Sequence, residues 1–322
     1  MYNHPKDETF AAEDETLEDR ERWLRSVLMN LEDGVIATNR DGVVNFLNPA
    51  AETLLRRSRE TVLGQRLEEA LVFVSERTGL PVPVTIAEIV EHALPPPEER
   101  EVNLVLEEER IPVEFTATLM RDEQGQIYGS VLVVRDITRR KLQERRLAYL
   151  AIHDSLTGLP NRTLFNDRLS LALAAASRYN QILAVLVLDI DRFKQVNNTH
   201  GEACGDMLLA KAARRLVTMM RKSDTVARSE SDEFLLLLPG ITDAEVTGRI
   251  ALRIQDSLLN PFELGSERIA ISASIGIAIF PQDGRDGDTL VRRAELALQA
   301  AKDAGRDTYR LYQAIAHQDR SG

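Results

Sequence analysis

Acidic residues occur in two short groups that have the composition of a metal-binding site. Asp189 and Asp191 follow one apolar run, and Asp232 and Glu233 stand side by side before a second run that begins at Phe234. An adjacent acid pair is costly unless a cation neutralises it, and carboxylate oxygens are preferred ligands of Mg²⁺ and Mn²⁺. Solvated acids at loop edges would explain any one of these residues alone. If the two runs are neighbouring strands, the whole set indicates two divalent ions at the strand ends, an arrangement suited to nucleotidyl transfer.

The turn before the acid pair lacks the residues that a tight hairpin prefers. Residues 225–229 and the run from Phe234 predict two strands folded back on each other, with Glu230 and Ser231 at the centre of the turn. A two-residue loop needs positive φ there, and a non-glycine residue in left-handed geometry costs about 1–2 kcal/mol. A Glu side chain also blocks the close backbone approach that Gly allows. The sequence therefore predicts intact acids beside an altered turn.

The composition bounds the class of protein. The 322 residues suffice for two ordinary domains, and 43% hydrophobic with 28% charged residues is typical of a soluble globular protein. A formal charge of −11 argues against a nucleic-acid or anionic membrane surface. A single cysteine, Cys204, excludes an intrachain disulfide and favours a reducing compartment. With no apolar run long enough to span a bilayer, we expect a cytoplasmic protein.

The first half of the chain predicts an α+β sheet with short helices. Residues 1–20 are acid-rich, and we expect them to form a disordered tail. An amphipathic helix is expected at 21–31, and further short helices at 50–55 and 85–92. Five strands are expected, at residues 34–41, 42–48, 102–107, 111–119 and 128–136.

The second half predicts a larger α+β sheet with helices on its faces. It is joined to the first half by residues 139–152, whose spaced leucines suit either a helix that pairs with its copy in a dimer or a solvated linker helix. We expect a domain at 153–315 and a tail at 316–322. Its helices are expected at 164–177, 205–220, 244–258 and 289–304, and its strands at 182–189, 225–229, from 234, as a pair within 269–280, and near Tyr309.

The first half resembles PAS domains. The resemblance is carried by residues 34–48, by the Asn48-Pro49-Ala50-Ala51 segment and by the closing residues 136–141. It implies a PAS sensor domain over residues 21–138. PAS domains bind varied ligands or none, so the fold leaves the ligand of this one unknown.

The second half resembles the GGDEF family of diguanylate cyclases, over about residues 150–315. The family joins two GTP molecules into cyclic di-GMP at the face between two domains, on a nucleotidyl-cyclase-like sheet. The matching segments are residues 154–162, 189–197, 205–206, 232–234, 272–276 and 301–306.

The resemblance implies roles for individual residues. Asp189 and Glu233, with the Ile190 carbonyl oxygen, match the ligands of Mg²⁺ or Mn²⁺, and Asp232 and Glu233 match the catalytic acids. A carboxylate that accepts from the guanine N1–H and N2–H₂ groups discriminates against adenine. The guanine-reading pair is matched by Asn197 and Asp206, and the phosphate-binding groups by Phe193, Lys194, Lys302 and Arg306.

The main departure from the family lies at Glu230 and Ser231, where the family has two glycines. Those glycines let backbone N–H groups press against GTP. At ~5 Å and an effective dielectric constant of ~20, a Glu carboxylate is repelled by each phosphate charge by about 3 kcal/mol. That repulsion corresponds to a rate loss on the order of a hundredfold if it acts in the transition state.

A second motif is intact. Arg221-Lys222-Ser223-Asp224 has the spacing of the family's RxxD inhibitory site for cyclic di-GMP, and Arg253 resembles the arginine that completes this site from a neighbouring domain. Arg offers a bidentate fork to guanine or phosphate, and Asp accepts from the guanine edge. A basic helix end capped before a strand would explain the same residues structurally.

These features favour a regulatory protein. In this interpretation a PAS domain controls a degenerate GGDEF domain that binds cyclic di-GMP, binds GTP at the altered site and has weak or absent synthesis. The alternative is an active diguanylate cyclase that its product inhibits through the RxxD site, and a third possibility is a dimerisation module. The expected partners are GTP, cyclic di-GMP and a second copy of the chain, whereas a downstream effector or phosphodiesterase is unknown.

Overall fold

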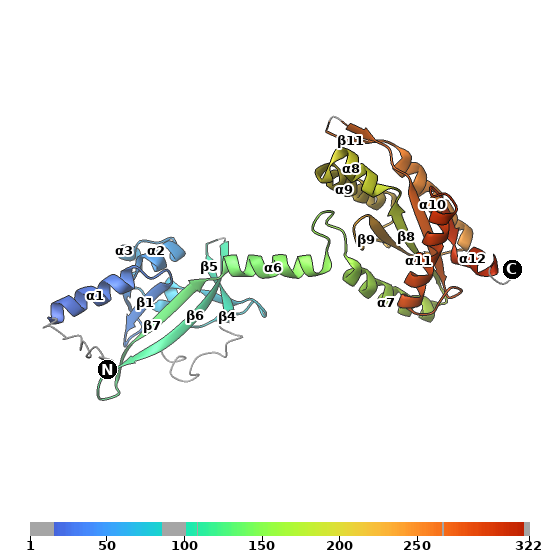
Figure 1. The fold of residues 1–322 in the computed structure, drawn as a ribbon. Coiled ribbons are helices and arrows are strands. Elements are labelled where there is room, and N and C mark those ends of the chain that lie inside the picture. The colour runs from blue at the N-terminus through green and yellow to red at the C-terminus, as the bar shows by residue number, and fades with distance from the viewer. Residues whose placement is uncertain (1–15, 86–100, 108, 266, 319–322) are drawn as a thin grey trace, which may run out of the picture. The chain divides into compact units, whose positions relative to one another are not determined.

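The computed structural model describes residues 16–85, 101–107, 109–265 and 267–318. The chain divides into two compact units between Arg145 and Arg146 (Figure 1). Residues 86–92 of the helix expected at 85–92 and residues 1–15 of the expected tail lie outside the described residues. In the part of the chain that is described, no helix combines the length and apolar character that crossing a bilayer requires.

The first unit contains a seven-stranded antiparallel sheet in the order β2-β1-β7-β6-β5-β3-β4 (Figure 1). Helices α2 (Pro49–Leu55), α3 (Arg59–Val62) and α4 (Leu67–Ala70) contribute to its core. The short strands β3 and β4 are absent from the sequence prediction, because so few residues carry no periodicity and the pairing of β3 with β5 is long-range. The strands are β1 (Gly34–Asn39), β2 (Val44–Leu47), β3 (Phe73–Ser75), β4 (Pro81–Val82), β5 (Glu101–Leu106), β6 (Glu109–Arg121) and β7 (Ile127–Asp136).

Helix α1 (Leu17–Met29) begins at Leu17 rather than at the predicted Glu21. The Thr16 side chain caps it by accepting a hydrogen bond from the Asp19 backbone N–H. Residues 17–20 are therefore helical, and the expected disordered tail does not extend over them. At the other end of the helix, the buried Asn48 side chain donates to the Leu28 carbonyl oxygen over 3.1 Å.

Helix α6 (Thr138–Ile152) confirms the expected helical linker, and none of its residues is buried. In the first unit, the Lys141 ammonium contacts Glu76 at 3.0 Å and also pairs with Glu101. In the second unit, the Asn161 amide donates to the Ala151 carbonyl oxygen over 2.9 Å. Each end of the helix is thus held by its own unit. The pairing of α6 with a second copy stays a prediction.

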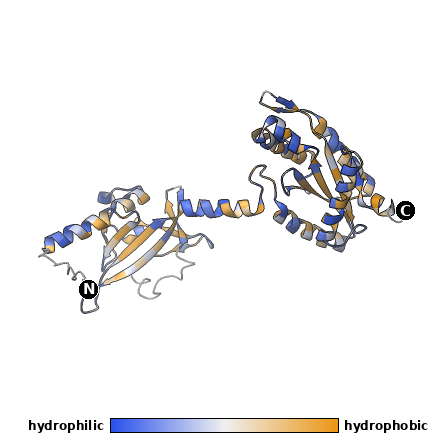
Figure 2. Cartoon of the chain, in the orientation of Figure 1, coloured by the Kyte–Doolittle hydropathy of each residue, from blue (hydrophilic) through white to orange (hydrophobic). Residues whose placement is uncertain are grey.

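The second unit is built on a five-stranded sheet in the order β14-β13-β8-β10-β9 (Figure 1). The apolar residues of its strands point alternately into two clusters, one with α7 and α11 and the other with α9 and α10. Figure 2 shows the hydrophobic colour concentrated on these strands. The elements are α7 (Arg162–Tyr179), β8 (Ile182–Ile190), α9 (Glu202–Met219), β9 (Thr225–Arg228), β10 (Glu233–Ile241), α10 (Ala244–Leu259), β13 (Ala273–Phe280), α11 (Gly287–Asp303) and β14 (Tyr309–Leu311).

Three local features of this unit differ from the sequence prediction or are absent from it. The helix α8 (Phe193–His200) was not expected, because it is short and lies in a polar segment. The expected strand pair within 269–280 is one strand of the main sheet, β13, whose residues are all buried, while β11 (Phe262–Leu264) and β12 (Glu267–Ile269) form a separate two-stranded sheet. Helix α12 (Tyr312–Gln318) continues past the expected domain end at 315.

Gly276 on β13 provides a test of the packing between α11 and the sheet. A Cβ atom at this position would overlap the Ala294 carbonyl oxygen and the Leu298 backbone nitrogen. These are backbone atoms, so no side chain can rotate away. We expect Gly276→Ala to lower the free energy of unfolding by about 3 kcal/mol or more, at the upper end of overpacking costs, in denaturant titrations followed by circular dichroism.

Gly287→Ala is the matched control, because it adds the same methyl group at the first residue of α11. There the added atom would meet side chains instead of backbone: Leu169 Cδ2 at 3.1 Å and Leu173 Cδ1 at 3.9 Å. We expect this variant to stay within about 0.5 kcal/mol of the parent. Equal stability of the two variants would contradict the close approach of α11 to β13.

Candidate functional site

The two acidic groups meet because β8 and β10 are neighbouring antiparallel strands. Asp189 lies directly opposite Glu233 in the register. Opposed residues of an antiparallel pair project from the same face, with Cβ atoms about 5 Å apart. The same face carries Val187 and Leu235, which pack with α7 and α11. Asp189 and Glu233, called the acid pair from here on, therefore lie at the rim of this face, where β8 ends and β10 begins.

Burial and mutual repulsion disfavour the charged forms of both acids. Burial is the main cause that raises the pKa of the Asp189 carboxyl, and Asp232 and Asp191 add to the rise. Burial likewise raises the pKa of Glu233, with a further contribution from Asp189. Two carboxyls with raised pKa values at one rim are the electrostatic condition under which a bound cation is most favourable.

The residues present fit a divalent ion. Mg²⁺ is usually held by one or two carboxylates together with water and substrate phosphates, and Asp189 and Glu233 supply two carboxylates on one face. In the described chain no group of three or more His, Cys, Asp or Glu side chains forms a complete cage. A cation already stands at the site, since the Lys302 ammonium lies 2.7 Å from Asp189 Oδ2. Ile190 ends β8 between these acids, and its N–H donates to the Asp232 carbonyl oxygen over 3.3 Å.

Asp191 does not belong to this site, contrary to the sequence prediction. The chain leaves the strand after Ile190, so the side chain of Asp191 turns into the protein and is 7% exposed. It accepts hydrogen bonds from the hydroxyls of Ser272 and Ser274, each over 2.7 Å, and from the Asp307 N–H over 3.0 Å. Both of its oxygens are occupied by protein donors, so its role is structural.

The altered turn keeps the hairpin closed, with a different geometry from the one expected. Only Ser231 has positive φ, at 40°, whereas Glu230 does not. The Glu233 N–H donates to the Glu230 carbonyl oxygen over 2.7 Å, and the Ser229 N–H donates to the Glu233 carbonyl oxygen over 3.0 Å. The loop is therefore longer than a two-residue primed turn, and it needs a left-handed residue only once. The Glu230 side chain is exposed at its tip.

Arg228 stabilises this turn, a role that the sequence analysis missed. Its guanidinium donates to the Ser231 carbonyl oxygen over 2.8 Å from Nε and 2.6 Å from Nη2. Its Nη1 donates to both oxygens of Asp154, over 3.0 and 3.1 Å. Although burial opposes it, hydrogen bonds from Thr157 and Arg228 lower the pKa of Asp154. The sequence carries one signal for this contact: an acid at Asp154 in a segment that matches the family, and an arginine at the end of the strand before the turn.

Arg162 holds the turn from its other side. At the start of α7, its guanidinium lies 3.3 Å from the Ser229 hydroxyl and 3.1 Å from Glu295 on α11. The Ser229 hydroxyl and the Arg162 charge oppose the rise in the pKa of Glu233, whereas Glu295 adds to it. Arg162 at the start of α7, with Lys302 and Glu295 on α11, thus surrounds the acid pair with two cations and a further acid.

The predicted guanine-reading residues form a second cluster. Asn197 on α8 lies against Gly205 on α9, where a Cβ atom would overlap the Asn197 Oδ1 atom. That buried oxygen has no hydrogen-bond partner in the structure, and Asp206 follows Gly205 with an exposed side chain. Because α8 begins just after β8, this cluster and the acid pair both border the end of β8.

The predicted phosphate-binding residues differ in their burial and in their contacts. Phe193 is buried at the start of α8, and Lys194 beside it is exposed. Lys302 reaches the acid pair from the last turn of α11. Arg306 follows this helix with an exposed side chain and a φ of 69°. The structure therefore joins Lys302 to the acids and leaves Lys194 and Arg306 facing solvent.

The RxxD residues line one pocket of this chain, with a volume of about 350 Å³. Arg253 reaches it from α10 of the same unit, and its contribution to the site of a neighbouring domain stays a prediction. Asp224 Oδ2 accepts from the Arg221 N–H, and Arg253 donates to the Met219 carbonyl oxygen, each over 2.9 Å. The contact of Arg253 also caps the end of α9, whereas that of Asp224 closes the turn that follows the helix. The pocket is lined by Met219, Met220, Arg221, Asp224, Val246, Arg249, Ile250 and Arg253.

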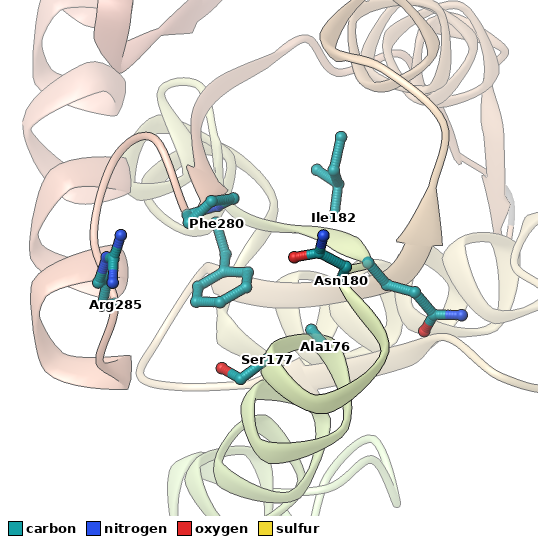
Figure 3. Close-up of a pocket in the computed structure, with 8 residues that line it drawn as sticks. Ala176, Ser177, Asn180, Ile182, Phe280 and Arg285 are labelled. Carbon is teal, nitrogen blue, oxygen red and sulfur yellow. The ribbon is translucent and has the colours of Figure 1, made fainter.

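Another pocket, of about 390 Å³, lies at the opposite end of β8 (Figure 3). Ile182 begins β8 there, and Phe280 ends β13 beside it. Ser177, Asn180 and Arg285 complete its polar wall. None of the predicted site residues lines this pocket, so it is separate from the acid pair.

Comparison with known proteins identifies both units. The profile of the family described as "Diguanylate cyclase, GGDEF domain" matches residues 151–308. The profile described as "PAS fold" matches residues 23–137.

Individual relatives are similar to all or part of this chain. The probable diguanylate cyclase DgcE of Escherichia coli is 31% identical over 310 residues, which cover 94% of this chain and 28% of DgcE. The bifunctional diguanylate cyclase/cyclic di-GMP phosphodiesterase MucR of Pseudomonas aeruginosa is 41% identical over 165 residues, 51% of this chain and 24% of MucR.

Among solved structures, the GGDEF domain of TpbB from Pseudomonas aeruginosa is 39% identical. The match covers 51% of this chain and 99% of the TpbB domain, with a TM-score of 0.49. The chain spans less than a third of the length of DgcE or MucR. The two profile matches decide the assignment: the chain belongs to the diguanylate cyclase GGDEF family and carries a PAS domain in front of its GGDEF domain.

Proposed function

We propose that this chain acts in cyclic di-GMP signalling as a PAS-regulated, degenerate GGDEF protein. In this proposal the RxxD pocket binds cyclic di-GMP, and the altered site binds GTP with Mg²⁺ or Mn²⁺ but has weak or absent synthesis. One observation carries the proposal: an exposed Glu230 carboxylate stands at the tip of the hairpin that presents Asp232 and Glu233.

The physical argument rests on charge and backbone access. Asp189 and Glu233 already bring negative charge to the rim of the sheet. Glu230 adds a further carboxylate where the family has glycine. At ~5 Å and an effective dielectric constant of ~20, its repulsion of a phosphate charge is about 3 kcal/mol. The Cβ atoms of Glu230 and Ser231 also stand where glycine backbone would approach the nucleotide.

The active cyclase is the second candidate, and a specific observation favours it. The hairpin keeps Glu233 opposite Asp189 despite the altered turn. The two hydrogen bonds from Arg228 to the Ser231 carbonyl oxygen support the left-handed residue without glycine. In that case the protein converts two GTP molecules to cyclic di-GMP, with product inhibition through the RxxD pocket.

Further parts of the proposal follow from composition and family. We propose domains at 21–138 and 153–315 joined by the helix at 139–152, a homodimer formed through this helix, and a cytoplasmic location in keeping with the single cysteine. The family also favours a signalling role over a pure dimerisation module, since MucR is a cyclic di-GMP enzyme. The PAS ligand and the downstream partner stay unassigned.

Turnover is the first test. We expect the full chain to make little or no cyclic di-GMP from GTP and Mg²⁺, as measured by product chromatography. Glu230→Gly with Ser231→Gly should raise turnover on the order of a hundredfold, because it removes about 3 kcal/mol of repulsion.

Two single variants separate the causes. Glu230→Gln removes the charge and keeps the side chain, whereas Ser231→Gly changes only the left-handed position. A gain with Glu230→Gln alone assigns the defect to repulsion. Wild-type turnover equal to that of the double variant would support the active cyclase instead.

Cyclic di-GMP binding is the second test. In calorimetry, Arg221→Ala should weaken binding about 10- to 100-fold, since one charge-assisted hydrogen bond contributes about 1.5–3 kcal/mol. Arg214→Ala is the matched control, because Arg214 is an exposed arginine of α9 that does not line the pocket. Equal affinities of the wild type and Arg221→Ala would restrict these residues to capping α9.

A further inference from the structure

Lys302 makes the closest cationic contact of the acid pair. Its ammonium lies 2.7 Å from Asp189 Oδ2, and the two side chains are only 26% and 17% exposed. The lysine belongs to the last turn of α11, which is anchored by the buried Ala301 and Leu298. The contact is therefore a partly buried ion pair held by a packed helix.

The surroundings explain why a cation is needed there. Asp189 lies opposite Glu233, while the Arg162 guanidinium is engaged by Glu295 and Ser229. The Lys302 ammonium is the cation that contacts Asp189 directly. Without it, two half-buried carboxylates would stand opposite each other with less compensation.

The same contact conflicts with a divalent ion. An ion bound to Asp189 Oδ2 at the usual 2.0–2.1 Å for Mg²⁺ would lie beside the ammonium, and like charges at such a separation repel strongly. Lys302 and a divalent ion therefore compete for the same oxygen.

We infer that Lys302 is the built-in counter-ion of the acid pair, which occupies the cation position of Asp189 and leaves it when a divalent ion binds. The inference rests on the proposed function, because it takes Asp189 and Glu233 as the metal ligands. The released ammonium is then available to the phosphates of a nucleotide. As a consequence, Lys302 weakens the binding of the metal alone and strengthens that of the metal with a triphosphate, so the two ligands become cooperative.

The test is Mn²⁺ binding by the full chain in the absence of nucleotide, measured from the electron paramagnetic resonance signal of free Mn²⁺. We expect Lys302→Met to bind Mn²⁺ at least fivefold more tightly than the wild type. Lys302→Gln should bind Mn²⁺ as tightly as Lys302→Met, so that a folding defect of one variant cannot account for the result. Lys302→Arg, which keeps the charge, should bind Mn²⁺ with an affinity close to that of the wild type. A residue that serves only as a phosphate clamp would leave Mn²⁺ affinity unchanged.

Arg292→Met is the control for the general electrostatic field. It removes the same charge from an exposed side chain of α11 that belongs to neither the acids nor the predicted phosphate-binding residues. We expect its Mn²⁺ affinity to stay within twofold of the wild type. A gain equal to that of Lys302→Met would overturn the inference, because it would show a field effect rather than direct competition.

A second measurement uses a non-hydrolysable GTP analogue with Mn²⁺. Lys302→Met should reduce the binding of the analogue at least fivefold while the binding of Mn²⁺ alone improves. Unchanged or weaker Mn²⁺ binding by Lys302→Met, with measurable binding by the wild type, overturns the inference and leaves the proposed function standing. An absence of Mn²⁺ binding in both proteins overturns the metal site and the inference together.

Discussion

The pairing of β8 with β10 is the constraint on which the second unit depends. Both strands are buried on both faces, so a slip of one residue would exchange every side chain between two packed layers. The register is therefore fixed along the whole pair, and with it the placement of Asp189 opposite Glu233. The apolar packing deeper in the sheet therefore fixes the positions of the two acids at the rim.

A fixed register also explains how the hairpin tolerates an unusual turn. The strands determine where the chain must reverse, so Glu230 and Ser231 adapt to them rather than the opposite. The left-handed Ser231 is supported by Arg228, which Asp154 holds in turn. The cost of a non-glycine residue is thus offset outside the hairpin, and what the glycines would have given is access to the backbone, not the fold of the turn.

Three basic side chains around the site are paired with groups of opposite charge. Arg228 joins Asp154 to the turn, Arg162 lies between Ser229 and Glu295, and Lys302 contacts Asp189. At the end of α9, Asp224 and Arg253 cap backbone groups and line a pocket at the same time. Both roles are compatible, because a carboxylate and a guanidinium each have more acceptors or donors than these single contacts use.

The sequence alone determined the apolar strands and the long amphipathic helices, because the periodicity of apolar residues is a property of the sequence itself. It predicted the meeting of the two acidic groups only on the condition that their strands are neighbours, which the pairing of β8 with β10 then decided. It could not determine elements as short as β3, β4 and α8, since a few residues carry too little pattern. Nor could it show that Asp191 turns inward while Asp189 stays at the rim, because that depends on where β8 ends. The contacts of Arg228, Arg162 and Lys302 join distant segments, and such contacts exist only once the helices have packed on the sheet.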